Sequence, residues 1–107
     1  MDQSEERSIS LDNLPVEWDR LQVELDRLRR IDLSLRRIVL AIAERSRCSF
    51  RYRNHRGKIS DRKAILGHLR HAATEWHPEP QWLVDAWDCD KLLQRTFAVA
   101  DILEWLP

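Results

Sequence analysis

Apolar positions in the first part of the chain recur at alternating spacings of four and three residues. The stripe consists of Leu14, Trp18, Leu21, Leu25 and Leu28, and Leu35, Val39 and Ile42 extend it beyond Asp32. This spacing places the side chains on one face of an α-helix. It predicts one amphipathic helix, or two helices that meet near Asp32, whose carboxylate would then accept hydrogen bonds from the first amides of the second helix.

After Ser46 the pattern changes from helical to alternating. Cys48, Phe50 and Tyr52 fall on one face of a predicted strand, with arginines on the other face. Residues 54–57 are predicted to form a hairpin turn, because Gly57 can supply the positive φ that such turns often require. Residues 58–69 are then the return strand, and residues 68–74 fit either a short strand or a loop.

The last third of the chain predicts a β-hairpin. Residues 81–87 and 92–99 are strand-like runs, and the polar residues 88–91 between them suit a connection built on a type I turn. Pro78 and Pro80 lack amide donors, so a rigid turn precedes the hairpin. Together the patterns predict an α+β fold, in which a helix is followed by about five short antiparallel strands in a small open β-barrel.

The chain therefore divides into three predicted parts. Residues 1–13 are polar, lack an apolar period and are predicted to be disordered. Residues 14–46 are helical, and residues 47–107 form the barrel. So small a sheet can cover only part of so long a helix. We therefore expect the stripe of Leu14, Trp18, Leu21, Leu25 and Leu28 to pair with a second copy or with another protein.

The formal net charge is zero, but the charges are unevenly distributed. Seven cations stand against Asp61 alone between residues 47 and 63: Arg47, Arg51, Arg53, Arg56, Lys58, Arg62 and Lys63. This run is either a solvated basic strand pair or a local patch for anions that the net charge conceals. Two widely separated cysteines, no signal peptide and no long apolar run predict a cytoplasmic protein without a membrane span.

Arginines and aromatic residues on the predicted strands are the candidates for ligand binding. Arg56, Arg62 and Arg95 can each offer a planar set of donors to phosphate, and Tyr52 and Trp82 can offer ring faces to a base. Both aromatic residues could instead belong to the core. Arg95 shares strand parity with Phe97, and the pattern leaves open whether it lies at the rim or pairs with an acid such as Asp85.

Catalytic and metal-binding signals are weak. His68, His71 and His77 do not combine with either cysteine into a known pair of metal ligands. No carboxylate is linked in sequence to a nucleophile or to a glycine-rich loop. We therefore expect neither a metal site nor a cofactor, and we expect the chain not to be an enzyme.

The strand residues resemble those of the WYL domain family. The resemblance rests on residues 50–57, Arg62, residues 82–84, residues 95–97 and Ile102. They follow the family's order of a tyrosine-bearing strand, a turn glycine, an arginine on the next strand, a W-Y-L run and an R-x-F strand. The resemblance implies an Sm-like, SH3-type β-barrel. It also implies kinship with bacterial regulators, in which the barrel senses a ligand behind a winged-helix DNA-binding domain. In some of them the ligand is single-stranded nucleic acid or a nucleotide.

The chain departs from this pattern at several positions. Leu83 stands where the family has its middle tyrosine, and Leu66 stands where a proline usually closes the second strand. Ala100 and Asp101 replace the usual Asp-Arg before Ile102, so one basic ligand contact is missing. No helix-turn-helix precedes the predicted barrel, and we therefore do not expect this chain alone to read duplex DNA.

The sequence thus predicts a stand-alone, WYL-like sensing module. Its expected ligand is a nucleotide or single-stranded nucleic acid, and its expected ligand site is Tyr52, Arg56, Arg62, Trp82 and Arg95. The alternative is a protein–protein interaction module that dimerises through its helix and docks a partner protein, with no nucleic-acid ligand.

Overall fold

The computed structural model describes residues 15–107, and it begins with one unbroken helix, α1 (Pro15–Glu44). Asp32 lies inside this helix, where its carboxylate is 3.4 Å from the guanidinium of Arg36 one turn later. It is therefore not a cap, and of the two predicted alternatives the single helix is correct. The helix ends in a Schellman motif, in which Ser46 N donates to Ala41 O and Arg45, at φ 53°, donates to Ile42 O.

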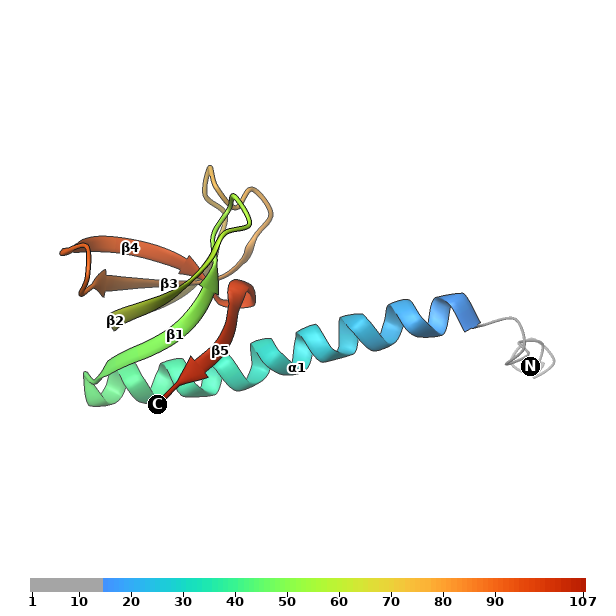
Figure 1. Ribbon diagram of the computed structural model, residues 1–107, viewed down its shortest axis with the longest axis horizontal. Helices are drawn as coiled ribbons and strands as arrows, with labels where there is room; N and C mark the ends of the chain where they lie inside the picture. Colours follow the sequence, from blue (N-terminus) through green and yellow to red (C-terminus); the bar gives the residue numbers. More distant parts are fainter. Residues whose placement is uncertain (1–14) are drawn as a thin grey trace, which may run out of the picture.

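Five antiparallel strands follow the helix (Figure 1). They are β1 (Arg47–Arg53), β2 (Ile59–Ala72), β3 (Gln81–Asp88), β4 (Leu93–Ala98) and β5 (Ile102–Leu106), with a short 3-10 turn, η3 (Val99–Asp101), before β5. The order in the sheet is β4-β3-β2-β1-β5. The predicted α+β fold is confirmed. Closure into a barrel is not confirmed, because β4 and β5 are the two edges of the sheet in the part of the chain that the structure describes.

The long strand β2 connects the two halves of the sheet. Its first part pairs with β1 up to Ile65, and its second part pairs with β3 from Ala64 to Ala72, with an irregular register at Gly67. Residues 68–72 therefore continue the strand, which resolves the predicted ambiguity over this segment. Such an irregularity bends a strand, so one continuous segment can follow the curvature of the sheet.

The core lies between the concave side of the sheet and the second half of α1. Phe50, Tyr52 and Phe97 contact one another edge to face, with the Phe97 ring centroid 5.2 Å from that of Phe50 and 5.0 Å from that of Tyr52. From the helix, Ile38 and Ala41 are fully buried against this cluster. The indole of Trp105 on β5 donates to the Ser34 hydroxyl at 3.0 Å, which fixes the helix to the last strand.

One predicted helix position does not face the core. Val39 was expected to continue the apolar stripe, but it is exposed, and Ile38 is buried instead. Successive residues of an α-helix are about 100° apart, so the buried face, which contains Ser34, Ile38 and Ala41, is offset by one position from the predicted stripe. Leu35 and Ile42 lie at the edge of this face and are partly buried.

The first half of α1 extends away from the sheet (Figure 1), and the molecule is 60 Å long. Trp18, Leu21, Leu25 and Leu28 of the predicted interface are all exposed. Leu14 and the polar segment 1–13 lie outside the described residues. Despite this apolar stripe, none of the described helices combines the length and the hydropathy needed to cross a membrane.

Candidate ligand-binding site

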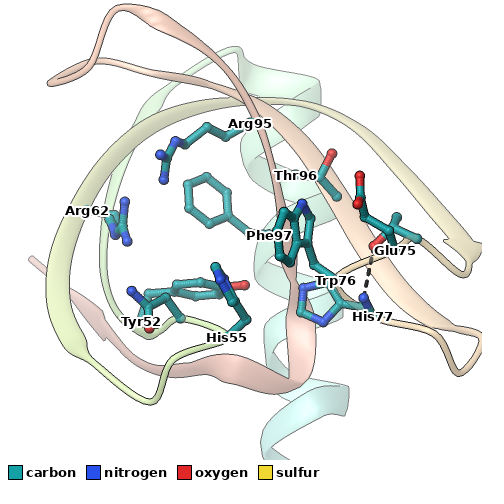
Figure 2. A pocket seen from close by; sticks show the side chains of 11 residues that line it. Tyr52, His55, Arg62, Glu75, Trp76, His77, Arg95, Thr96 and Phe97 are labelled. Carbon is teal, nitrogen blue, oxygen red and sulfur yellow. Dashed lines mark hydrogen bonds between the residues drawn. The ribbon is translucent and has the colours of Figure 1, made fainter.

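A cavity of about 520 Å³ opens where the concave side of the sheet meets two connecting loops (Figure 2). Strands β1, β2 and β4 supply part of its wall, and the β1–β2 turn and the β2–β3 loop supply the rest. The lining residues are Tyr52, Asn54, His55, Arg62, Thr74, Glu75, Trp76, His77, Arg95, Thr96 and Phe97. The cavity therefore joins segments that are far apart in the sequence.

Two arginines from different strands enter the cavity. Arg62 on β2 and Arg95 on β4 lie on the same face of the sheet as the core residues. The guanidinium carbon of Arg62 is 5.7 Å from the centroid of the Tyr52 ring and 5.9 Å from that of Phe97, within the range of a cation–π interaction. The Arg62 side chain is only 12% exposed, whereas that of Arg95 is 38% exposed.

A buried carboxylate lies between these arginines. Asp88, the last residue of β3, is 1% exposed, and its Oδ2 is 3.8 Å from a terminal nitrogen of Arg62 and 3.6 Å from Nε of Arg95. Its Oδ1 accepts hydrogen bonds of 3.0 Å from the amides of Asp90 and Lys91, which holds the β3–β4 turn. Asp88 Oδ2 and Arg62 Nε have no hydrogen-bond partner among the described residues.

The partner of Arg95 is therefore Asp88 and not Asp85. Asp85 instead accepts two hydrogen bonds from Arg70, at 2.9 and 3.2 Å, and one from the Thr96 hydroxyl at 2.6 Å. Burial alone would raise the pKa of Asp85, but the hydrogen bonds from Arg70 and Thr96 lower it below its ordinary value. The shared parity of Arg95 and Phe97 did predict that both side chains turn to the same face of β4, as they do.

Tyr52 belongs to the core and also lines the cavity. It is 5% exposed, and its hydroxyl oxygen accepts a hydrogen bond from the backbone amide of Ala98 at 2.8 Å. Burial raises the pKa of Tyr52 to about 12, because the phenolate would lose its hydration. The side chain is therefore a neutral part of the wall at physiological pH.

Two aromatic rings from separate loops meet at the rim of the cavity. The rings of His55 and Trp76 have their centroids 4.6 Å apart and are inclined by 32°. Trp76 is 60% exposed, and a tight turn presents it, because Thr74 and His77 exchange backbone hydrogen bonds of 2.8 and 3.1 Å. Sequence reasoning missed this pair. The sequence contains one indication of this pair. Trp76 lies next to a turn with two prolines and outside the predicted strands, where it cannot pack into the core of the sheet.

The structure brings three of the five predicted site residues together, namely Tyr52, Arg62 and Arg95. Arg56 lies in the exposed β1–β2 turn, where its backbone amide donates a hydrogen bond of 2.9 Å to Asn54 Oδ1. The side chain of Arg56 does not line the cavity. Trp82 lies at the beginning of β3, at the opposite end of that strand from Asp88. It is 40% exposed and packs edge-on against His71, so it is in neither the core nor the cavity.

The basic run does not form one continuous patch. Arg51 faces away from the core and forms ion pairs of 3.1 Å with Asp61 and 3.2 Å with Glu104, whereas Arg62 turns into the cavity. Asp101, which replaces a basic residue of the family pattern, does not line the cavity. Burial raises the pKa of Asp101 despite the nearby charges of His77 and Arg53. Within residues 15–107 no group of three or more His, Cys, Asp or Glu side chains is placed to hold a metal ion.

Comparisons with known proteins support the fold alone. No family model matches the chain, and no curated protein matches it. Among solved structures, the chain is similar to proteasome accessory factor B/C (PafBC) of Arthrobacter aurescens, with 19% sequence identity and a TM-score of 0.58. The match covers 72% of this chain and 11% of that chain. At this level of identity the likeness shows a shared fold over the matched part of the chain.

Proposed function

We propose that this chain is a WYL-like, regulatory ligand-sensing module that binds a nucleotide or single-stranded nucleic acid in the cavity between β1, β2 and β4. The observation that carries the proposal is the position of Arg62 and Arg95, which reach one side of the cavity from separate strands. Figure 2 shows these two side chains opposite Trp76 and His77, which lie on the other side. The cavity thus offers cationic donors and aromatic faces to the same ligand.

This combination suits the chemistry of nucleotides. A guanidinium can donate two parallel hydrogen bonds to a phosphate, and such charge-assisted bonds are stronger than neutral ones. Exposed aromatic rings such as Trp76 bind unpaired bases by stacking, whatever the base. We propose binding rather than catalysis, because the groups that carry the proposal, two arginines and exposed ring faces, recognise a ligand and do not by themselves perform chemistry on it.

The regulatory part of the proposal comes from the resemblance of the strand residues to the WYL domain family, and the likeness to PafBC supports a shared fold. The chain spans only 11% of the PafBC chain that it matches, so the ligand and the pathway are argued from the cavity and not from that protein. The competing function is a protein-interaction module without a nucleic-acid ligand. The exposed apolar stripe of α1 favours an interaction surface of that kind, and we propose that it pairs with a second copy of the chain.

Fluorescence anisotropy of a labelled single-stranded oligonucleotide tests the ligand proposal. Binding should weaken as salt rises, because phosphate contacts release counterions. Arg62→Ala and Arg95→Ala should each flatten the plot of log K against log salt by roughly 0.7, the coefficient for one phosphate contact of a single strand. Arg56→Ala is the matched control, because Arg56 lies outside the cavity, and its slope should equal that of the wild type.

Two outcomes would overturn this proposal. One is the absence of binding at low salt, which would favour the protein-interaction function. The other is an equal effect of Arg56→Ala, Arg62→Ala and Arg95→Ala, because attraction that depends only on overall charge needs no cavity. A duplex of the same sequence should bind more weakly than the single strand, because paired bases cannot stack on Trp76.

A further inference from the structure

The carboxylate of Asp88 gives the cavity an unusual charge balance. It is almost completely buried, and its Oδ2 lies 3.6 Å from Arg95 Nε and 3.8 Å from Arg62, beyond hydrogen-bond distance from both. Of the described residues, none donates a hydrogen bond to this oxygen. The two guanidinium groups therefore face one carboxylate, and the three side chains together carry a net charge of +1 that an anionic ligand can neutralise.

The other charges of the adjoining hollow do not change that balance. The hollow next to the cavity is lined by Asp88, Arg62 and Arg95 and also by two lysines and two aspartates, namely Lys58, Lys91, Asp61 and Asp90. These four charges cancel in sum. In the cavity itself, Glu75, His55 and His77 stand on the loops, and Tyr52 is neutral. Glu75 is exposed, so water and salt screen its carboxylate far more than that of Asp88, and what remains of its charge adds to the repulsion of a second negative charge.

We propose that Asp88 is a specificity-determining residue, which limits the cavity to a singly charged anionic group. An internal phosphodiester of a single strand carries one negative charge and balances the site. A terminal phosphate monoester carries close to two at neutral pH, since its second pKa is about 6. The second charge would be repelled by the Asp88 carboxylate, which is almost completely buried and therefore poorly screened by water. The inference rests on the proposed function, and it states which phosphate groups within the proposed ligand class the site prefers.

Matched small ligands test this inference. The probes are a nucleoside 5′-monophosphate and its methyl ester, which have the same base and sugar but differ by one negative charge. Calorimetric titration of the wild type near neutral pH should give tighter binding of the methyl ester. In Asp88→Asn the preference should fall or reverse, and we expect the ratio of the two affinities to change roughly tenfold, which corresponds to about 1.4 kcal/mol.

The choice of asparagine keeps the turn intact. The remaining amide oxygen can still accept the hydrogen bonds from the amides of Asp90 and Lys91, which hold the β3–β4 turn. Glu79→Gln is the matched control, because Glu79 is exposed and lines neither the cavity nor the adjoining hollow. It removes the same charge elsewhere on the surface, and the ratio of affinities should stay at the wild-type value.

A second measurement needs no variant, so it also applies if Asp88→Asn does not fold. When the pH falls below about 6, the monophosphate takes up a proton and becomes singly charged, whereas the methyl ester does not change. The ratio of the two affinities is compared at each pH, because the two ligands share the same base and sugar and differ in the charge of the phosphate. In the wild type the preference for the methyl ester should disappear at the lower pH.

The outcomes separate the two proposals. If the wild type binds both ligands but prefers the monophosphate, or if Asp88→Asn leaves the ratio unchanged, the role of Asp88 is overturned and the ligand proposal stands. A preference for the methyl ester that does not depend on pH would also overturn the role of Asp88. If neither small ligand nor the single-stranded oligonucleotide binds, the ligand proposal itself is overturned, and the role of Asp88 with it.

Discussion

The hydroxyl oxygen of Tyr52 accepts a hydrogen bond from the backbone amide of Ala98 at 2.8 Å, across the concave side of the sheet. Tyr52 lies on β1 and Ala98 on β4, and two strands separate them in the order β4-β3-β2-β1-β5. The bond therefore fixes the distance between two walls of the candidate site. It also satisfies an amide at an edge strand, which a buried position would otherwise leave unpaired.

The first prediction concerns the ionisation of Tyr52. Burial raises its pKa from 10.0 to about 12, so the folded state holds the phenolic proton more tightly than the unfolded state. The corresponding stability is fully present below pH 10 and is lost as the pH rises through 12. The shift corresponds to roughly 2–3 kcal/mol of unfolding free energy. Because the chain has one tyrosine, the ultraviolet absorbance of tyrosinate reports this residue alone.

Tyr52→Phe is the control for this titration. It should be less stable than the wild type at neutral pH by about 1–3 kcal/mol, because the buried amide of Ala98 loses its acceptor. Between pH 10 and 12 it should lose less stability than the wild type, because only the wild type has the phenolic proton of Tyr52 to lose. A tyrosinate signal that appears near the ordinary pKa of 10.0 would contradict the buried position of the hydroxyl.

The sequence predicted the strands and the direction of several site residues correctly. The alternation of apolar and polar residues correctly placed Phe50 and Tyr52 on one face of a strand. Arg95 and Phe97 are two residues apart, which correctly placed both side chains on the same face of β4. Strand parity depends only on the local geometry of the backbone. It therefore needs no knowledge of which strands are neighbours.

The sequence could not show which charges meet. The ion pairs of Asp88 with Arg62 and Arg95 depend on the registers of β2, β3 and β4, and a shift by one residue would turn each side chain to the other face. The contact between His55 and Trp76 joins two loops, and no periodic pattern describes loops. Trp82 was predicted to bind the ligand or to lie in the core, because tryptophan is common in strands, but its place at the beginning of β3 leaves it exposed and outside the cavity.

The second prediction concerns assembly through α1. Trp18, Leu21, Leu25 and Leu28 form an exposed apolar stripe on the part of the helix that extends from the sheet. Contiguous apolar surface of this kind usually marks an interface, so we expect a dimer at roughly tens of micromolar in sedimentation or light-scattering experiments. Leu21→Asp should dissociate the dimer and leave the melting of the sheet unchanged.

Val23→Asp is the matched control for Leu21→Asp. Val23 is 71% exposed, and two positions along a helix correspond to about 200° of rotation, so it lies on the other side of α1. This variant should remain dimeric. A wild-type protein that is monomeric in this concentration range would show that the stripe does not pair with a second copy.

The last prediction separates the two tryptophans near the β2–β3 loop. Trp76 is 60% exposed at the rim of the cavity, so Trp76→Ala should leave thermal unfolding unchanged and weaken the binding of a single-stranded oligonucleotide. The loss of one stacked base should cost about 1–3 kcal/mol of binding free energy. Trp82→Ala removes a contact with His71, whose ring centroid is 5.1 Å away, and should cost about 1 kcal/mol of stability without changing ligand affinity. Anisotropy and thermal melting of both variants check these outcomes. If Trp82→Ala loses the ligand while Trp76→Ala retains it, the base binds at the residue that the sequence predicted and not at the rim formed by Trp76 and His55.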